Sequence, residues 1–332
     1  MQDKMDIVVT WVDGNDKLWL KERQKYETKN ITNDAVDAKR FRDWDILKYW
    51  FRSIEKYAPF AKNIYFVTYG HVPKWLNTKH PQIRVVKHAD FMPKEYLPTY
   101  NSVAIELNFH RIPGIGKKFI YFNDDMFLLQ PTTLEDYFTK DGRIKYNFIE
   151  SAMTSTGELD PTYRDMLINT IEIVNGNYKK RRFKNLTWRD PIVLYNNLKA
   201  IGFKKYLGYA PHHFSRVYDR EVMKQIWNDS FDILDQTSKA KFRSKETITP
   251  DIIELTQVSL GMTRAYYARK REKYLEINAD TVNKIAKIIK SQSVKEVCLN
   301  DLCTDADFEG CRDQLVAAFE ETFPEKSKFE LE

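Results

Sequence analysis

The 332-residue sequence contains few cysteines and no long apolar run. Its three cysteines, Cys298, Cys303 and Cys311, are too few for a disulfide framework and lack the paired spacing of a zinc site. No stretch approaches the roughly 20 apolar residues that a transmembrane helix needs. The N-terminus also lacks the charged and then apolar pattern of a signal peptide. We therefore expect a reduced, cytoplasmic protein that is at most peripheral at the inner face of a membrane.

Signals of nucleic-acid binding are weak. The 53 Lys and Arg residues exceed the 47 Asp and Glu residues by only six charges. Two basic runs, 179–184 and 269–273, lie near aromatic residues, but short charged runs usually form a solvated helix face and no recognised binding module accompanies them. We expect no nucleic-acid partner. A charged acceptor polymer or an anionic lipid surface fits these runs better.

Apolar β-type runs alternate with helical patterns over the first 130 residues. The β-type runs are 6–11, 63–70, 82–88 and 118–122. The helical patterns are 42–57 and 101–112, the second with Ser102 as its N-cap. This alternation predicts an α/β fold with a mostly parallel, Rossmann-like sheet and right-handed crossovers.

The second half of the chain is predicted to be largely helical. The expected helices are 165–174, 191–201, 219–227, 250–276 and 305–323. We divide the chain into an α/β core for nucleotide sugar and metal at 1–150, a variable, mostly helical insertion at 151–208, and a helical segment at 209–332 that returns to complete the active site. No internal repeat or low-complexity tract interrupts this order.

The most informative segment, Lys118–Phe127, is a strand-like apolar run that ends in two adjacent carboxylates, Asp124 and Asp125. Acids are excluded from a buried strand, so both should lie at its mouth, where α/β sheets bind ligands. Hard divalent cations that bind phosphates take one or two carboxylates plus substrate oxygens. The pair therefore indicates a Mg²⁺ or Mn²⁺ site for a nucleotide diphosphate. The alternative is a turn that merely closes the strand.

Two further segments carry candidate chemistry. The turn Val12–Asp16 follows the first expected strand, which places Asp13 and Gly14 where a nucleotide would lie. Two adjacent histidines, His212 and His213, stand in an expected loop. Histidine is the usual general base at neutral pH, although a structural pair remains the alternative. Adjacent residues of extended chain face opposite ways, so one of the two should point into a site.

Several segments, in chain order, resemble signature regions of the Stealth family. Those of the first two regions are Asp6–Gly14, Arg42–Ile54, Pro73–Leu76, Leu97–Glu106 and Phe122–Met126. The third region is represented by 212–220 and 242–243, and the fourth by 297–301 and 323–330. The Stealth family includes bacterial capsular polysaccharide phosphotransferases and the catalytic subunit of the lysosomal-enzyme N-acetylglucosamine-1-phosphotransferase. Residues 150 to 208 match no region, and we expect acceptor recognition there.

The resemblance implies a glycosyltransferase-A-like fold and a sugar-1-phosphate transferase. Such an enzyme would transfer hexose-1-phosphate, usually that of an N-acetylhexosamine, from a UDP-sugar such as UDP-GlcNAc to a hydroxyl of an oligosaccharide or polysaccharide. A phosphodiester would form and UMP would leave, in the synthesis of capsule or exopolysaccharide. A metal-dependent UDP-sugar glycosyltransferase that releases UDP is the alternative, followed by a non-catalytic polyanion-binding protein.

The resemblance also implies residue roles. The metal ligands would be Asp125, Asn300 and Asp301, and the catalytic residues Asp124, Arg243 and His213, with His213 as the base and His212 as its substitute. The nucleotide would be bound by Thr10, Trp11, Asp13, Gly14, Arg42 and Asp43. The donor sugar would be bound by Asn101, Ser102 and Glu106. Core packing for Trp11, a helix cap for Ser102 and an ion pair for Arg243 are the structural alternatives.

Overall fold

The computed structural model describes residues 4–27, 41–151, 160–181, 186–266 and 271–331. Residues 182–185 and 267–270 lie outside these ranges; they overlap the two basic runs, and 267–270 also belong to the expected helix at 250–276. Among the described residues, no helix combines the length and the apolar character that crossing a bilayer requires.

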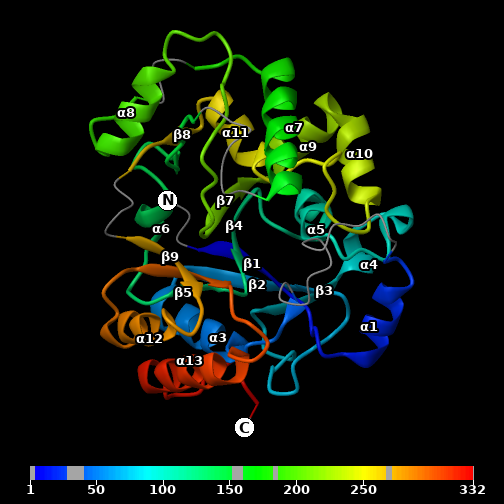
Figure 1. The fold of residues 1–332 in the computed structure, drawn as a ribbon, viewed down its shortest axis with the longest axis vertical. Helices are drawn as coiled ribbons and strands as arrows, with labels where there is room; N and C mark the ends of the chain where they lie inside the picture. Colours follow the sequence, from blue (N-terminus) through cyan, green and yellow to red (C-terminus); the bar gives the residue numbers. More distant parts are fainter. Residues whose placement is uncertain (1–3, 28–40, 152–159, 182–185, 267–270, 332) are drawn as a thin grey trace.

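A five-stranded sheet of order β3-β2-β1-β4-β7 lies at the centre of the molecule (Figure 1). Its strands are β1 (Met5–Trp11), β2 (Ala61–Thr68), β3 (Ile83–Lys87), β4 (Lys118–Asn123) and β7 (Arg216–Asp219). β7 pairs antiparallel with β4, and the other neighbours are parallel. The mostly parallel, Rossmann-like α/β class expected from the sequence is confirmed.

The strand order reverses beside β1, because β2 and β4 flank it on opposite sides. Thr10 lies opposite Val67 of β2 and opposite Asn123 of β4. Ligands of such sheets bind outside the carboxyl ends of the strands at this switch point. The ends of β1 and β4 are therefore where a site is expected.

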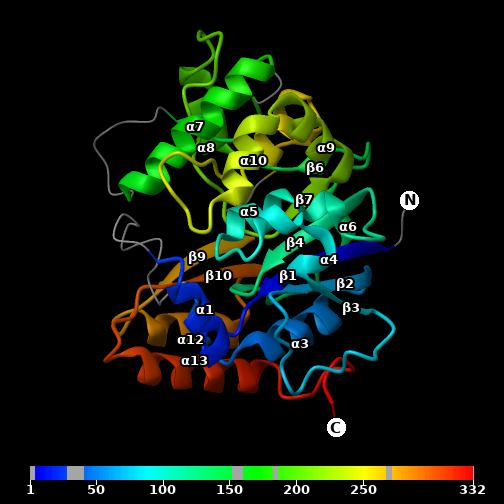
Figure 2. The ribbon, with the colours of Figure 1, turned by 90° about the vertical axis from the view of Figure 1, so that its right-hand side faces the viewer.

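Helices enclose the sheets on both sides. The first half contributes α1 (Lys17–Gln24), α3 (Leu47–Tyr57), α4 (His88–Phe91), α5 (Ser102–Leu107) and α6 (Leu134–Tyr137), with short 3-10 turns at Lys94–Tyr96 and Phe109–Arg111. The second half contributes α7 (Pro161–Asn177), α8 (Pro191–Lys199), α9 (Arg220–Asp229), α10 (Phe231–Lys239), α11 (Ile252–Ser259), α12 (Val282–Ser291) and α13 (Phe308–Thr322). α3, α12 and α13 lie on one side, and α7, α8 and α10 on the other (Figure 2).

Helix α3 shows why the core forms where it does. Its apolar residues recur at helical spacing, so Trp50 and Phe51 are fully buried, and the Trp50 ring lies 5.7 Å from that of Phe122 on β4. The helix begins at Leu47, later than the expected position 42, because Asp45 has a φ of 57° in the left-handed region. Arg42 and Asp43 therefore lie in a loop before the helix.

The second half also supplies strands. β8 (Thr263–Arg264) pairs with β6 (Ile144–Lys145), and β10 (Glu296–Asp301) lies between β5 (Met126–Leu128) and β9 (Glu272–Ile277). The expected helix at 250–276 is wrong beyond Ser259. Gly261, with a φ of 75°, follows the end of α11, and pairing with β10 makes residues 272–277 a strand. This pairing is long-range, so local helix propensity did not reveal it.

The C-terminal segment is bound to α3 by a buried ion pair. Arg52 donates from Nε and Nη2 to the Glu330 carboxylate at 2.8 and 2.9 Å, and from Nη1 to the Phe323 carbonyl at 2.7 Å. The Arg52 and Glu330 side chains are 6% and 4% exposed. Removing one partner of such a pair leaves the other charge buried without compensation.

Arg52→Ala should therefore lower the free energy of unfolding by about 3–5 kcal/mol at pH 7, measured by urea denaturation. Lys328→Ala, which removes a half-exposed amine 4.0 Å from Glu55, is the control and should change it by less than about 1 kcal/mol. Equal stability of the Arg52 variant and the parent would contradict the anchoring role.

Candidate active site

Several carboxylates gather beyond the carboxyl ends of β1 and β4. Asp124 and Asp125 form the turn between β4 and β5, as the sequence predicted for acids at the mouth of a strand. Burial, followed by the charges of Asp125 and Asp43, raises the pKa of Asp124 to about 8. Burial and the charges of Asp45 and Asp13 raise the pKa of Asp43 despite a backbone hydrogen bond. Carboxylates this close repel one another unless a cation is bound between them.

The surroundings of Asp125 fit a divalent cation. Its Oδ1 is buried and has no hydrogen-bond partner among the described residues. Its Oδ2 lies 3.8 Å from His213 Nε2 and accepts a hydrogen bond from the Cys298 thiol at 3.5 Å. Asp125, His213 and Cys298 bring one ligand atom each to within 4.8 Å of one another. An orphaned carboxylate oxygen beside other acids is what a hard cation uses, so the residues fit Mg²⁺ or Mn²⁺.

Cys298 fits the role of hydrogen-bond donor better than that of metal ligand. Burial and the nearby charge of Asp125 raise the pKa of its thiol well above the usual range. The Asp125 carbonyl also accepts a hydrogen bond from the Leu299 amide at 2.9 Å. β10 therefore holds the Asp125 turn through both its backbone and its side chains.

His213 lies in the loop before β7 and faces Asp125. Asn123 Nδ2 lies 3.2 Å from its Nε2, and Arg216 Nη2 donates to its Nδ1 at 3.4 Å. A guanidinium can only donate, so Arg216 holds the ring through Nδ1, and Nε2 faces Asn123 and Asp125. The side chain is 42% exposed, so a substrate hydroxyl can reach it.

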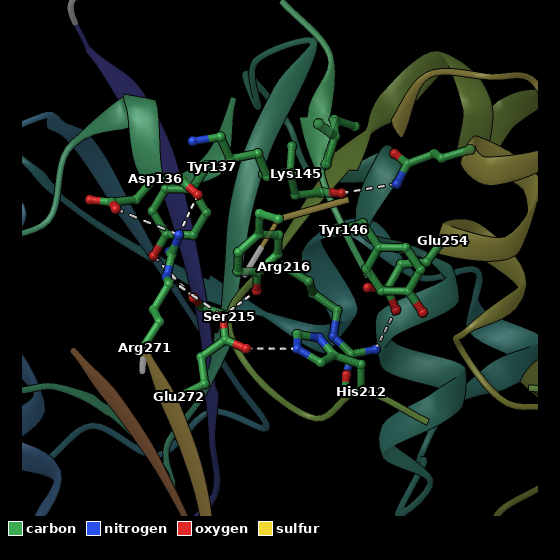
Figure 3. A pocket seen from close by; sticks show the side chains of 14 residues that line it. Asp136, Tyr137, Lys145, Tyr146, His212, Ser215, Arg216, Glu254, Arg271 and Glu272 are labelled. Carbon is green, nitrogen blue, oxygen red and sulfur yellow. Dashed lines mark hydrogen bonds and ion pairs between the residues drawn. The ribbon is translucent and has the colours of Figure 1, made fainter. Parts of the chain in front are cut away.

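His212 points the other way, as expected for adjacent residues. Its side chain is 17% exposed, and its Nε2 lies 2.8 Å from the Glu272 carboxylate. Burial opposes its charged form, but the charge and hydrogen bond of Glu272 raise its pKa above the usual value. Its side chain lines an internal polar pocket with Arg216, Glu254 and Glu272 (Figure 3). The structure thus brings His213 to Asp125, and His212 to this pocket.

The buried guanidinium of Arg216 fixes the histidine loop. It contacts Glu254 at 2.8 Å (Figure 3). It also contacts Asp251 at 3.4 Å and donates to the His212 carbonyl at 3.0 Å. The two acids lie at the start of α11 and compensate the buried cation. The position of His213 therefore depends on α11.

Of the predicted nucleotide residues, Thr10 and Trp11 lie at the end of β1 and Asp13 lies just beyond it. The hydroxyl of Thr10 lies 3.2 Å from that of Tyr121 and donates to Asn123 Oδ1 at 3.5 Å, so it belongs to the strand-end network. Trp11 stacks on Phe66 at 5.8 Å, which matches the core-packing alternative. The Asp13 amide donates to His71 at 3.1 Å.

Gly14 is required for a close approach of two chain segments. A Cβ at this position would lie 1.6 Å from the Phe41 carbonyl oxygen. Just beyond Phe41, Arg42 binds Asp305 at 2.9 Å and lies 3.7 Å from Asp301 at the end of β10. The contribution of Asp301 and the adjacent Asn300 to a metal site stays a prediction.

The predicted donor-sugar residues lie at the start of α5 and within it. The N-cap is Asn101, and the expected cap at Ser102 is wrong, because Asn101 Oδ1 accepts the helix N–H two residues on at 3.1 Å. Ser102 Oγ accepts a hydrogen bond from Arg243 at 2.7 Å, so these two are brought together. Glu106 is buried and accepts from the Tyr218 hydroxyl. Sugar binding by these residues stays a prediction.

Three residues of the site escaped sequence reasoning. Asn123 entered only as a member of the Phe122–Met126 signature segment, Cys298 only as a reduced thiol, and Arg216 was not singled out. The available signal for Asn123 was its position directly before two acids. Cys298 and Arg216 had no local signal, because their partners lie far away in the sequence.

The protein is an α/β protein with a mostly parallel sheet. The acids and the histidine at the switch point of this sheet form a candidate active site. The models of Stealth conserved region 1 and conserved region 2 match residues 3–31 and 40–146. A capsular polysaccharide phosphotransferase (WcwK) of Streptococcus pneumoniae is 35% identical, covering 99% of this chain and 100% of its own. An exopolysaccharide phosphotransferase (cps2G) of Lactiplantibacillus plantarum is 33% identical, covering 98% and 96%. The chain belongs to the Stealth family.

Likeness to solved structures is weaker. The galactosyltransferase LgtC has a TM-score of 0.38 and 11% identity, covering 94% of this chain and 96% of its own. Mouse xyloside xylosyltransferase 1 also has a TM-score of 0.38, covering 89% and 97%.

The contacts of Glu296 on β10 generate a pH prediction. Glu296 is buried and accepts from the amide and hydroxyl of Ser215, two residues after His213, at 2.5 and 2.7 Å. Burial, followed by the charge of Glu272, raises its pKa from 4.5 to about 7. The folded protein then binds more protons here than the unfolded chain between these values, so stability falls as the pH rises through this window.

Glu296→Gln should remove this loss, because an amide can make both contacts without titrating. The free energy of unfolding of the variant should therefore decline less between pH 5 and 8 than that of the parent, measured by urea denaturation at each pH. Exposed Glu309→Gln is the control and should leave the profile unchanged. A Glu296 variant with the parental slope would refute the assignment.

Proposed function

We propose that this protein transfers hexose-1-phosphate, as that of an N-acetylhexosamine, from a UDP-sugar to a glycan hydroxyl. A phosphodiester forms and UMP is released, in the synthesis of capsule or exopolysaccharide at the cytoplasmic face of the membrane. The observation that carries the proposal is the placement of Asp125 against His213 at the switch point of the sheet. Relatives over nearly the full length that are named polysaccharide phosphotransferases support it.

The reaction needs charge neutralisation and positioning more than covalent help from the protein. The acceptor oxygen attacks the β-phosphorus, the bond from that phosphorus to the UMP oxygen breaks, and the anomeric C–O bond stays intact. A divalent cation held by Asp125, with Asp124 close by, would neutralise the diphosphate. This role also explains why the fold keeps several acids together despite their repulsion.

The remaining site residues act on the two substrates. His213 accepts the proton of the acceptor hydroxyl on its exposed ring. Arg243, beside Ser102, offers its guanidinium to a phosphate oxygen. Thr10 and Asp13, at the end of β1, frame the nucleotide.

The product nucleotide tests the function. The protein would be incubated with UDP-GlcNAc or UDP-ManNAc, Mg²⁺ and capsule fragments, and the nucleotide and the new linkage identified. UMP and a phosphodiester are expected, whereas UDP would identify a glycosyltransferase. Asp125→Asn should abolish turnover with the fold intact, because a neutral amide cannot balance the cation and diphosphate. Exposed Asp141→Asn, remote from the switch point, is the control and should retain turnover.

The role of His213 is tested by its removal. His213→Ala should lower kcat by about 10²–10⁴-fold, the usual value of general-base help, and leave the UDP-sugar dissociation constant nearly unchanged. His212→Ala is the matched control: it should instead lower thermal stability, because it removes the 2.8 Å contact with the largely buried Glu272 side chain. An unchanged kcat per folded molecule of the His213 variant would remove this histidine from the mechanism.

A further inference from the structure

Helix α8 presents its more apolar face to solvent. Ile192, Tyr195 and Leu198 recur on one side of the helix and are 37%, 60% and 45% exposed. The opposite side, with Val193 and Asn197, is buried. A surface helix of a globular protein ordinarily buries its apolar stripe and exposes its polar one. Helix α8 shows the opposite arrangement, because the side that carries Ile192, Tyr195 and Leu198 faces solvent.

Flanking residues extend this face. Trp188, just before the helix, is 89% exposed, and Phe203, just after it, is 51% exposed. Five of the eleven large apolar side chains that are exposed among the described residues lie between positions 188 and 203. Scattered exposed apolar residues are ordinary, but a cluster of this kind marks an interaction surface. We refer to Trp188, Ile192, Tyr195, Leu198 and Phe203 as the α8 face.

The surroundings of the α8 face are basic. Arg189, Lys199, Lys204 and Lys205 are all exposed. The Lys199 ammonium lies 3.9 Å from the centroid of the Tyr195 ring. Asp190 is the one acid between positions 186 and 205, and it is buried as the N-cap of α8, where its Oδ1 accepts the Ile192 amide at 3.0 Å. An approaching partner would therefore meet aromatic and aliphatic side chains within a positive field.

The α8 face lies at the periphery of the molecule. α8 and α7 stand at the end opposite α13 and the C-terminus in both ribbon views (Figures 1 and 2). A broad, flat partner could thus contact α8 without covering α3, α12 or α13.

We propose that the α8 face docks this protein on an anionic lipid surface. Trp and Tyr favour the boundary between headgroups and acyl chains, and Lys and Arg around them pair with anionic headgroups. A neutral glycan could stack on the aromatic rings but would gain little from four cations. A second copy of the chain would bring like charges together. The proposal refines the membrane contact in the proposed function and does not depend on the transfer chemistry.

Vesicle co-sedimentation of the full chain tests this docking. Vesicles of phosphatidylcholine alone are compared with vesicles containing about one-third phosphatidylglycerol, at low and high salt. Binding to the anionic vesicles is expected, weakened by salt because the cations are exposed. Absence of binding to anionic vesicles would overturn the proposal, as would equal binding to neutral ones.

Paired variants locate the contact. Trp188→Ala with Tyr195→Ala should weaken partitioning by about tenfold or more, since burying one large apolar side chain is worth at least that factor. Phe231→Ala, at an exposed phenylalanine on α10, is the matched control and should bind as the parent does. Lys199→Glu with Lys204→Glu should remove the preference for anionic lipid. Unchanged binding by the double aromatic variant would assign the contact to another surface.

Two further measurements separate the possible failures. The dissociation constant of the UDP-sugar, whose predicted contacts all lie outside residues 188–203, should be unchanged in the aromatic variant, so loss of docking and loss of the folded donor site are read independently. If the variant binds vesicles normally but loses affinity for a soluble capsule fragment, the α8 face is a glycan site and the lipid proposal fails. Vesicle binding also stays measurable if the proposed transfer reaction proves wrong.

Discussion

The buried guanidinium of Arg216 is the contact on which the arrangement of the active site depends. Burying a cation is costly unless acids and acceptors satisfy it, and Arg216 has Glu254, Asp251 and the His212 carbonyl within 3.4 Å. As the first residue of β7, it also lies opposite Tyr121 of β4. One side chain therefore joins the central sheet, helix α11 and the loop that carries His213. The second half of the chain is thereby fixed to the first at the point where chemistry is proposed.

The acids at the switch point differ from Arg216, because their charged state is unfavourable in the protein alone. Burial, followed by the charges of neighbouring acids, raises the pKa of both Asp124 and Asp43, so the charged state is disfavoured in the protein alone. β10 stabilises this turn, since the Leu299 amide and the Cys298 thiol both donate to Asp125. The fold thus holds the turn in place and leaves Asp125 Oδ1 without a hydrogen-bond partner among the residues that the structure describes. A bound cation and diphosphate would compensate the repulsion between these acids. Such an arrangement is suited to binding a charged substrate.

The two halves of the molecule differ in what they could bind. The parallel strands and their carboxyl ends form a compact acidic site, where a metal and a nucleotide diphosphate would be bound together. The α8 face is basic and apolar and lies at one end of the molecule. A nucleotide-sugar donor and an anionic lipid surface would need two such surfaces of unlike chemistry. The histidine loop, between α8 and β7 in the sequence, connects them.

The sequence was sufficient for features set by short-range patterns. Apolar runs predicted the central strands, acids directly after a strand predicted the Asp124–Asp125 turn, and the family signatures predicted the class of enzyme. It failed where a distant segment determined the outcome, since residues 272–277 became a strand through pairing with β10. It also failed locally between two neighbouring cap candidates, because the side chain of Asn101 caps α5 in place of the Ser102 hydroxyl. The contacts of Asn123 with His213 and of Cys298 with Asp125 span 90 and 173 residues. Periodicity and propensity act over a few residues, so only the folded chain could show which side chains meet.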